Sequence, residues 1–590
     1  MSPSDRYSKR LGQREKLIAA FNRLHGHIGT ARLVLAATFL VLAWFCAVHR
    51  APSPLWLVIP GGLFLATVLY HQRIQTLRGL AQRAGMFYRE GLGRLQGQWR
   101  NHGPSGDQFN HEHHLYGGDL DLFGKQSLYE LLCTARTPMG ENTLARWLLA
   151  PADIDTIRDR QTCILELRNR LDLREHLATL GELRRIVLQP DTIATWAEAP
   201  NELPQRWLRF TAFTLAALAV VSAAIWAVWG IEFPFLAVLV SEAGLNYALR
   251  SRVQRCVSGV EHAYEDLKLL SVLLRRIEAE PFDSPPLRTL ALKLSSQTLT
   301  ASATLSKLAT IVNFVEARRN PLLAPLMLPL MYTIQSALAA ERWRQRHGHV
   351  VTSWLDVLGE IEALESMAAY SFERPDDPFP EFLDGPATFK ATGLGHPLID
   401  AQMRVRNDVD LSGDTRVLLV SGSNMSGKST LLRSVGMNTV LAMAGAPVCA
   451  TRLELTPLQV GASIRVNDSL YEGSSRFYAE ITRLRQLFEP SRLPLLFLLD
   501  ELLQGTNSTD RRIGAQGVVR ALLGRGAIGL VSTHDLALTD GTEFRHGALK
   551  NVHFQDELED GKLTFDFKLH DGVVTKSNGI ELMRAIGLDV

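Results

Sequence analysis

Residues 417–430 read VLLVSGSNMSGKST, which is an apolar strand followed by a glycine-rich loop and the start of a helix. The part from Gly422 to Thr430 fits the phosphate-binding pattern G-x-x-x-x-G-K-[ST] in the strand–loop–helix context that this pattern requires. Glycines let the backbone turn its N–H groups toward a polyphosphate, and the following helix adds the positive end of its dipole. The pattern predicts a nucleoside triphosphate site; a glycine-rich turn that binds nothing is the alternative.

Each loop residue has an expected part in this site. Lys428 is expected to reach the β- and γ-phosphates, and the Ser429 hydroxyl is expected to ligate Mg²⁺. The predicted nucleotide-binding residues are Gly422, Ser423, Asn424, Met425, Ser426, Gly427, Lys428, Ser429 and Thr430.

Two further apolar strands end in polar residues, residues 495–501 (LLFLLDE) and 527–535 (AIGLVSTHD). Ligands of open α/β sheets bind at the carboxyl ends of the strands, where these residues are expected to meet. Asp500 is predicted to be the second Mg²⁺ ligand and Glu501 the base for an attacking water. His534 is predicted to lie within reach of the γ-phosphate, with a purely structural histidine as the alternative.

Other motifs stand between and around these strands. In chain order they are Gly395-His396-Pro397, Asn407-Asp408, the phosphate loop, Gly473-Ser474-Ser475-Arg476-Phe477-Tyr478-Ala479-Glu480, Asp500-Glu501, Gly505-Thr506 and Thr533-His534. This order and spacing resemble the ATPase domain of MutS proteins. Upstream, residues 122–151 are similar to the start of the MutS core and residues 361–368 to the helix that returns to the ATPase, so the resemblance covers residues 115–590.

The resemblance implies ATP and Mg²⁺ as cofactors, ATP hydrolysis, and a homodimer with composite sites. The predicted fold class is a C-terminal α/β P-loop NTPase domain of the ABC/MutS type, joined to an all-α lever. Ser475 matches the serine that faces the γ-phosphate bound by the other subunit, which makes it a predicted catalytic residue in trans; an ordinary helix N-cap is the alternative. Asn467-Asp468 and Gly505-Thr506-Asn507 match loops at that interface.

The chain also departs from the family pattern. Ser423 and Ser426 stand where MutS proteins usually have Pro and Gly, and Gln504 stands where they usually have Arg. MutS proteins that recognise mismatches insert a Phe-x-Glu wedge into the duplex, and the residues before the core contain no such motif and leave no room for the domain that carries it. The sequence up to Val590 also contains no helix-turn-helix extension and no nuclease domain. Mismatch recognition by this chain alone is therefore not expected.

Two apolar runs, residues 31–48 and 55–70, occupy the N-terminal part of the chain. Each approaches the length of about 20 residues that crosses a bilayer, and together they predict a membrane hairpin. Basic residues flank both ends and predict that these ends lie in the cytoplasm: Lys9, Arg10, Arg14, Lys16, Arg23 and Arg32 before the hairpin, and Arg73, Arg78 and Arg83 after it. A signal peptide and a buried hairpin of a soluble domain are the alternatives.

A second apolar pair spans residues 210–249. Its first half, 210–229, is uncharged, whereas 231–249 carries Glu232 at the expected turn, together with Glu242 and Asn246, and predicts a span less clearly. Residues 321–340 are apolar but contain three prolines, which predicts a kinked core or membrane-surface segment.

These patterns divide the chain into three parts. Residues 1–114 form the first hairpin and a polar linker, 115–385 form the helical core with the second hairpin inserted, and 386–590 form the ATPase domain. The expected location is the cytoplasmic membrane, multi-pass, with the ATPase domain in the cytoplasm. Five cysteines lack metal or disulfide spacing, which suits a reducing compartment.

Three functions remain open. The first is a membrane-anchored, DNA-associated ATPase switch related to DNA repair, although 63 basic against 61 acidic residues give no basic excess, so DNA contacts would need local patches. Candidate patches are 250–255, 275–276, 318–319 and 342–346, and membrane-flanking or solvated charge is the alternative for each. The second function is a membrane ATPase acting on a lipid or protein, and the third is a nucleotide-gated scaffold.

Overall fold

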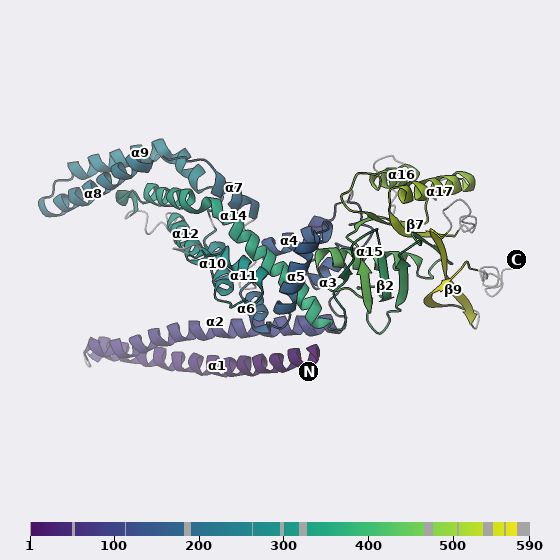
Figure 1. The fold of residues 1–590 in the computed structure, drawn as a ribbon. Coiled ribbons are helices and arrows are strands. Elements are labelled where there is room, and N and C mark those ends of the chain that lie inside the picture. Colours follow the sequence, from purple (N-terminus) through teal and green to yellow (C-terminus); the bar gives the residue numbers. More distant parts are fainter. Residues whose placement is uncertain are drawn as a thin grey trace. The chain divides into compact units, whose positions relative to one another are not determined.

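The computed structural model of the chain is shown in Figure 1, and it divides into two compact units. The structure describes residues 2–49, 53–111, 114–181, 190–203, 205–261, 263–295, 300–317, 327–464, 476–503, 507–534, 547–559 and 562–574. Unit 1 comprises residues 1–96, 136–139 and 170–359, and unit 2 comprises 97–135, 140–169 and 360–590. The two units are defined by compactness, whereas the limits near residues 114 and 385 were predicted from the family resemblance. These domain limits therefore stay predictions.

Unit 1 is helical in its described residues. Its elements are α1 (Pro3–His49), η1 (Pro54–Leu57), α2 (Val58–Leu95), α6 (Leu171–Gly181), α7 (Pro190–Glu198), α8 (Gln205–Trp229), α9 (Phe233–Val257), α10 (Tyr264–Glu278), α11 (Pro285–Leu292), α12 (Ala301–Ala317), η3 (Leu328–Leu330) and most of α14 (Tyr332–Glu373). Of the prolines at 321, 325 and 329, the last lies in η3, and the first two lie outside the described residues.

α1 and α2 run side by side as a helical hairpin (Figure 1). They have 47 and 38 residues, so they measure about 70 and 57 Å, well beyond the ~30 Å of a bilayer core. The predicted apolar runs are therefore only the adjoining ends of longer helices. The second run also begins differently from the expectation, because residues 54–57 form a turn of 3₁₀ helix before α2 starts.

The base of this hairpin is joined to α6 by polar contacts. The Tyr88 hydroxyl donates a hydrogen bond to Glu175, and Arg14 pairs with the same carboxylate at 2.5 Å. Arg10 pairs with Asp172 at 2.6 Å. Tyr88 and Glu175 are almost fully buried, and burial raises the pKa of the Tyr88 hydroxyl, so the phenol stays protonated and donates.

α8 and α9 form the second apolar hairpin, with the Trp226 and Phe235 rings stacked near its turn. Within the described residues, three helices are long and apolar enough to cross a membrane: Pro3–His49, Leu55–Leu95 and Trp207–Trp229. α9 is not among them. Asn246 of α9 faces another part of the unit, because its side-chain amide lies 3.7 Å from the Met331 sulfur.

Unit 2 contains η2 (Asp107–Phe109), α3 (Leu128–Leu132), α4 (Pro138–Leu149, except its first two residues), α5 (Ile154–Leu167) and the end of α14, followed by an α/β part. The strands are β1 (Glu381–Phe382), β2 (Phe389–Leu394), β3 (Asn407–Leu411), β4 (Val417–Ser421), β5 (Arg452–Leu455), β6 (Gln459–Ser463), β7 (Leu495–Asp500), β8 (Ile528–Thr533), β9 (Leu549–Glu559) and β10 (Lys562–Asp571). The remaining helices are α15 (Lys428–Ala444), α16 (Arg476–Gln486) and α17 (Ser508–Gly524).

The described strands form two sheets. The larger has the order β10-β9-β4-β8-β7-β6, in which every pair is parallel except β9 with β10. Strands β1, β5, β2 and β3 form the smaller sheet. α16 and α17 pack on Val417, Phe497 and Val531 on one face of the larger sheet, while Gly436 of α15 lies against Leu498 on the other. This three-layer arrangement confirms the predicted α/β domain after a helical region.

The stretch predicted as a polar linker is packed into unit 2 instead. The buried Tyr116 hydroxyl donates to the Leu148 carbonyl at 3.1 Å, and the His114 ring contacts the Leu149 carbonyl at 3.0 Å. A Cβ on Gly106 would lie 2.6 Å from the Tyr129 ring. Gly106 therefore allows this stretch to pack closely against α3.

Candidate nucleotide-binding site

The phosphate loop lies between β4 and α15, at the carboxyl end of the larger sheet. Gly422 and Gly427 have φ angles of 147° and 108°, and Met425 has a φ of 70°. A Cβ on Gly422 would lie 2.9 Å from the Ser426 hydroxyl and 3.1 Å from the Phe554 carbonyl, so this position requires glycine. The loop reverses the chain sharply, as expected of a backbone that wraps a phosphate.

Lys428 opens α15 and turns back over the loop. Its ammonium group donates to the carbonyls of Gly422 at 3.0 Å and Ser423 at 2.8 Å. The side chain is 5% exposed, and this burial lowers the pKa of Lys428, while the charges of Glu501 and Asp500 raise it. The lysine is thus held where the polyphosphate is expected.

The two carboxylates after β7 are positioned by the neighbouring strand. β7 and β8 are parallel, and their register sets Asp500 opposite Ser532. The Ser532 hydroxyl donates to the Asp500 carboxylate and accepts the Glu501 N–H at 3.1 Å. Glu501 has a φ of 50°, so the chain turns sharply directly after the strand. Ser532 was not among the predicted site residues. Its position at the end of the strand next to Asp500 could have indicated a contact with that carboxylate.

Glu501 and His534 meet at the loop, as predicted. The His534 Nε2 atom lies 2.5 Å from Glu501 Oε1 and 2.8 Å from Asn424 Oδ1. Two oxygen acceptors at this distance favour the tautomer with hydrogen on Nε2. Lys428 Nζ lies 3.3 Å from the same ring nitrogen and 4.0 Å from Glu501 Oε1. Lysine, glutamate and histidine from three separate motifs therefore form one cluster.

The residues present fit a magnesium nucleotide. The hydroxyls of Ser423 and Ser426 are buried and have no hydrogen-bond partner among the described residues. Buried hydroxyls are rarely left unpaired, so both are available to donate to phosphate oxygens. Ser429 is half-buried, and with Asp500 it offers the hydroxyl and carboxylate oxygens that Mg²⁺ prefers. The two serines that depart from the MutS pattern thus add donors.

Asn507 is described and caps α17, because its side chain accepts the Asp510 N–H at 2.9 Å. The other trans elements lie outside the described residues. These are Ser475, Asn467, Asp468, Gln504, Gly505 and Thr506, and their roles stay predictions. Next to them, the buried Glu480 of α16 accepts the Leu503 N–H at 2.5 Å. This contact ties α16 to the turn that follows Glu501.

Asn407 and two phenylalanines complete the site on the side of β9 and β10. The Asn407 side chain donates to the Phe567 carbonyl at 3.0 Å and accepts the Leu569 N–H at 2.9 Å. Phe567 would lie 3.4 Å from a Cβ on Gly427, and Phe554 is buried behind Gly422. No motif in the sequence marked the two phenylalanines, and no short-range pattern links Asn407 to a strand 160 residues further along.

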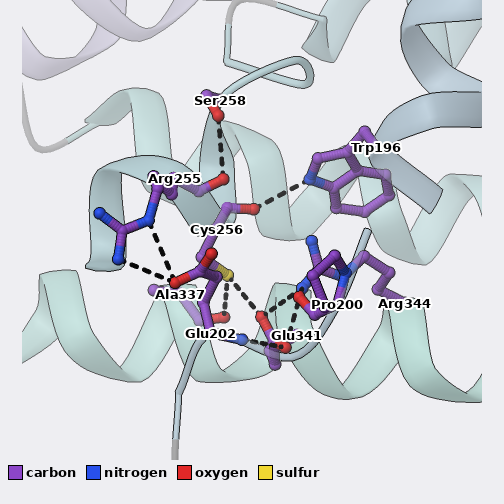
Figure 2. Close-up of polar contacts among 9 residues, drawn as sticks. All are labelled: Trp196, Pro200, Glu202, Arg255, Cys256, Ser258, Ala337, Glu341 and Arg344. Carbon is purple, nitrogen blue, oxygen red and sulfur yellow. Dashed lines mark hydrogen bonds and ion pairs between the residues drawn. The ribbon is translucent and has the colours of Figure 1, made fainter. Parts of the chain in front are cut away.

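One arginine in each of three candidate DNA patches of unit 1 is paired with a carboxylate of the same unit, and two of these arginines are drawn in Figure 2. Arg344 is buried and donates to both oxygens of Glu341 at 2.8 and 2.9 Å, so it is closed to DNA. Arg255 donates to Glu202, and Arg276 pairs with Glu280. Residues 318–319 lie outside the described part of the chain.

The loop, the lysine on its helix and the carboxylates at the end of the adjacent strand define a P-loop nucleotide-binding protein. The family models agree: the model for MutS domain V matches residues 418–589, and the model for MutS domain III matches residues 114–368. The chain belongs to the MutS family. Domain V is the part of these proteins that carries the ATPase.

Individual relatives are similar over part of their length. The chain is 33% identical over 231 residues to the DNA mismatch repair protein MutS of Geobacillus sp. (strain WCH70), covering 38% of this chain and 26% of that protein. It is 33% identical over 240 residues to the Endonuclease MutS2 of Thermus thermophilus, covering 40% and 31%. The chain therefore spans less than a third of these relatives.

Proposed function

We propose that this chain is an ATPase of the MutS type. The observation that carries the proposal is the meeting of Lys428, Glu501 and His534 at the phosphate loop, within 4.0 Å of one another. A loop that only binds phosphate needs the lysine, whereas a carboxylate at this position serves to activate an attacking water. The cluster therefore supports hydrolysis over a nucleotide-gated scaffold.

The roles of the residues follow from their chemistry. Lys428 exchanges its two loop carbonyls for phosphate oxygens, which are charged and form stronger hydrogen bonds. Glu501 accepts a proton from water, while His534, which donates to that carboxylate, holds it in place. Mg²⁺, held by Ser429 and Asp500, supplies charge neutralisation at the phosphates when bound.

The protein is proposed to work as a homodimer, with Ser475 of each subunit acting on the ATP of the other. This yields a complementation test, because Lys428→Ala and Ser475→Ala damage different sides of a composite site. Each variant alone is expected to be inactive, whereas a mixed dimer retains one intact site. Recovery of turnover on mixing supports the composite site, and two variants that stay inactive when mixed contradict it.

The chain is further proposed to be anchored in the cytoplasmic membrane, with the ATPase domain in the cytoplasm. The apolar ends of α1 and α2 and the helix α8 support this, because their large side chains are exposed, including Leu33 at 74%, Val58 at 67% and Phe210 at 73%. Apolar surface of this extent indicates contact with lipid or another protein. In MutS proteins the corresponding helices form a lever and a clamp that closes around DNA. In this chain the apolar hairpin of α8 and α9 is then proposed to replace the tip of that clamp with a membrane segment.

The proposed output is a DNA-associated conformational switch related to DNA repair, without mismatch recognition by this chain itself. One relative is named a DNA mismatch repair protein and another an endonuclease, which supports DNA as partner. A specific observation favours a second candidate, a membrane ATPase acting on a lipid or protein: Arg344 and Arg255, in two of the basic patches, are paired within unit 1.

ATP hydrolysis by the detergent-purified chain, with and without duplex and branched DNA, tests these functions. Lys428→Ala is the control and is expected to abolish turnover. Stimulation by DNA supports the DNA-associated switch, and turnover that no DNA changes supports the lipid or protein partner. Nucleotide binding without turnover in the unaltered chain contradicts the ATPase proposal.

A further inference from the structure

The α1–α2 hairpin carries basic side chains in the seam between its two helices. His25 and Arg32 on α1, and His71 and Arg78 on α2, are each seven residues apart, so each pair lies on one face of its helix. The rings of His25 and His71 lie 4.7 Å apart, and the Arg32 guanidinium lies 5.5 Å from the Phe64 ring of α2. These residues occupy positions where a helix pair normally buries apolar side chains.

Four nitrogens of the seam lack a hydrogen-bond partner. His25 Nδ1, Arg32 Nε, His71 Nδ1 and Arg78 Nε are buried and have no hydrogen-bond partner within the described part of the chain. The Gln75 amide nitrogen lies 3.0 Å from His71 Nε2, and because an amide nitrogen only donates, the neutral His71 ring carries its hydrogen on Nδ1. Leaving such donors unpaired costs about 1–3 kcal/mol each.

The hairpin offers no carboxylate to pair with them. No Asp or Glu occurs between Lys16 and Arg89. The base of the same hairpin differs, because Arg10 and Arg14 there are paired with Asp172 and Glu175 of α6. The basic side chains at the base of the hairpin thus have carboxylate partners. The basic side chains of the seam, nearer the apolar ends, have no carboxylate of the hairpin beside them.

The position of the seam identifies the missing anion. Arg32 lies at the start of the apolar run 31–48 on α1, and His71 directly follows the apolar run 55–70. With the apolar runs in a bilayer, these two residues lie at the depth of the lipid phosphates. We propose that the seam formed by His25, Arg32, His71 and Arg78 binds the phosphate of an anionic phospholipid. This inference rests on the proposed membrane attachment.

The chemistry of the seam favours a lipid phosphate. A guanidinium and imidazole N–H groups donate strong, charge-assisted hydrogen bonds to phosphate oxygens. The acyl chains of the same lipid have apolar surface beside the site, because Leu33 and Leu40 of α1 are 74% and 67% exposed. A headgroup with net negative charge also neutralises the positive charge of the seam. A zwitterionic headgroup carries its own cation, which already balances its phosphate, and so neutralises the seam less.

Lipid binding to the full chain in detergent micelles, measured by native mass spectrometry, tests the proposal. Phosphatidylglycerol is the probe, phosphatidylcholine is the zwitterionic comparison, and glycerol 3-phosphate represents free phosphate. Arg32→Gln is expected to weaken phosphatidylglycerol binding about tenfold, as for one lost charge-assisted hydrogen bond. Arg73→Gln is the matched control, because Arg73 is an exposed arginine on α2 outside the seam, and a change of less than about twofold is expected there.

Several outcomes overturn the proposal: equal binding of the two lipids, equal losses in Arg32→Gln and Arg73→Gln, or binding of glycerol 3-phosphate as tight as that of the lipid. The thermal stability of the unaltered chain provides a second measurement that needs no variant, and only phosphatidylglycerol is expected to raise its Tm. Extraction of the chain from membranes by alkaline carbonate reports on attachment separately. A chain that resists extraction but shows no lipid preference contradicts the seam site alone.

Discussion

At the scale of single residues, Glu501 distinguishes an enzyme from a nucleotide-gated scaffold. Replacing Glu501 by Gln keeps the size of the side chain and a contact to His534 but removes the base, so turnover is expected to fall about hundredfold or more while ATP binding persists. Steady-state hydrolysis and equilibrium binding of a fluorescent ATP analogue measure the two effects. Glu489→Gln, at an exposed acid just after α16, is the charge-matched control.

An unchanged turnover in Glu501→Gln would mean that another residue is the base. Loss of ATP binding together with turnover would instead indicate that Glu501 shapes the loop, since its carboxylate lies 4.0 Å from Lys428.

His396 gives unit 2 a sensitivity to acid. The ring is 8% exposed and accepts the Leu398 N–H at Nδ1, and burial followed by the charges of Arg433 and Arg404 lowers its pKa from 6.5 to about 4. The unfolded chain therefore binds a proton at a higher pH than the folded chain. Stability is expected to be full above pH 6.5 and to fall by about 3 kcal/mol as the pH drops to 4.

Thermal unfolding at several pH values checks this expectation. His396→Asn keeps an acceptor near the Leu398 N–H but does not titrate, so the decrease in Tm between pH 6.5 and 4 is expected to be smaller in this variant. The same pH profile in both proteins would assign the acid sensitivity to other groups.

Residue patterns pointed to the candidate site wherever its residues stand in short local motifs. The loop residues, Asp500, Glu501 and His534 stand in motifs a few residues long, and parallel strands bring their ends to one edge of the sheet. The role of Ser532 depends on strand register, which pairs it with Asp500 across 32 residues. Asn407 depends on a contact across 160 residues, and no local pattern contains that information.

At the scale of elements, the polar junction between α9 and α14 holds the second hairpin to the helical core. The Cys256 thiol donates to Glu341 at 2.9 Å, and Glu341 also pairs with the buried Arg344 (Figure 2). Burial raises the pKa of Cys256, so it remains a thiol and donates. Around the Glu341–Arg344 pair, the C-terminal end of α9 packs through Val253 and Val257 into an apolar cluster that includes Ile334 and Leu338 of α14.

Breaking this pair from one side is expected to be costly. Glu341→Gln leaves the Arg344 charge buried without its counter-ion, so the free energy of unfolding of the detergent-solubilised chain is expected to fall by about 3–5 kcal/mol. The double variant Glu341→Gln/Arg344→Met removes both charges and is expected to lose less than the single variant. Chemical denaturation of the unaltered chain and the two variants measures this, and a double variant that loses as much as Glu341→Gln or more would contradict the coupling.

The lengths of elements were less predictable than their kinds. Apolar runs predicted helices at 31–48 and 55–70, but α1 and α2 continue to Pro3 and Leu95. The extensions are polar on their exposed faces and are buried against each other and α6 through residues such as Tyr7 and Tyr88, each fully buried. Hydropathy marks the apolar ends only, because the packing of the extensions depends on tertiary contacts.

At the scale of the whole molecule, the proposed topology sets the two ends of α1 on opposite sides of the membrane. Ser53 lies in the connection between the apolar ends of α1 and α2, and Ser4 lies at the basic start of α1. In a Cys46→Ala background, Ser53→Cys is expected to react with a membrane-impermeant maleimide in intact cells. Ser4→Cys is expected to react only after permeabilisation, because basic flanks stay in the cytoplasm.

The remaining cysteines do not obscure this readout. Cys133, Cys163, Cys256 and Cys449 are buried, and burial raises the pKa of each thiol, which leaves little reactive thiolate. Labelling of both introduced cysteines in intact cells would contradict the orientation. Labelling of neither until the protein is denatured would favour a buried hairpin of a soluble unit, and the apolar ends of α1 and α2 would then pack on protein instead of lipid.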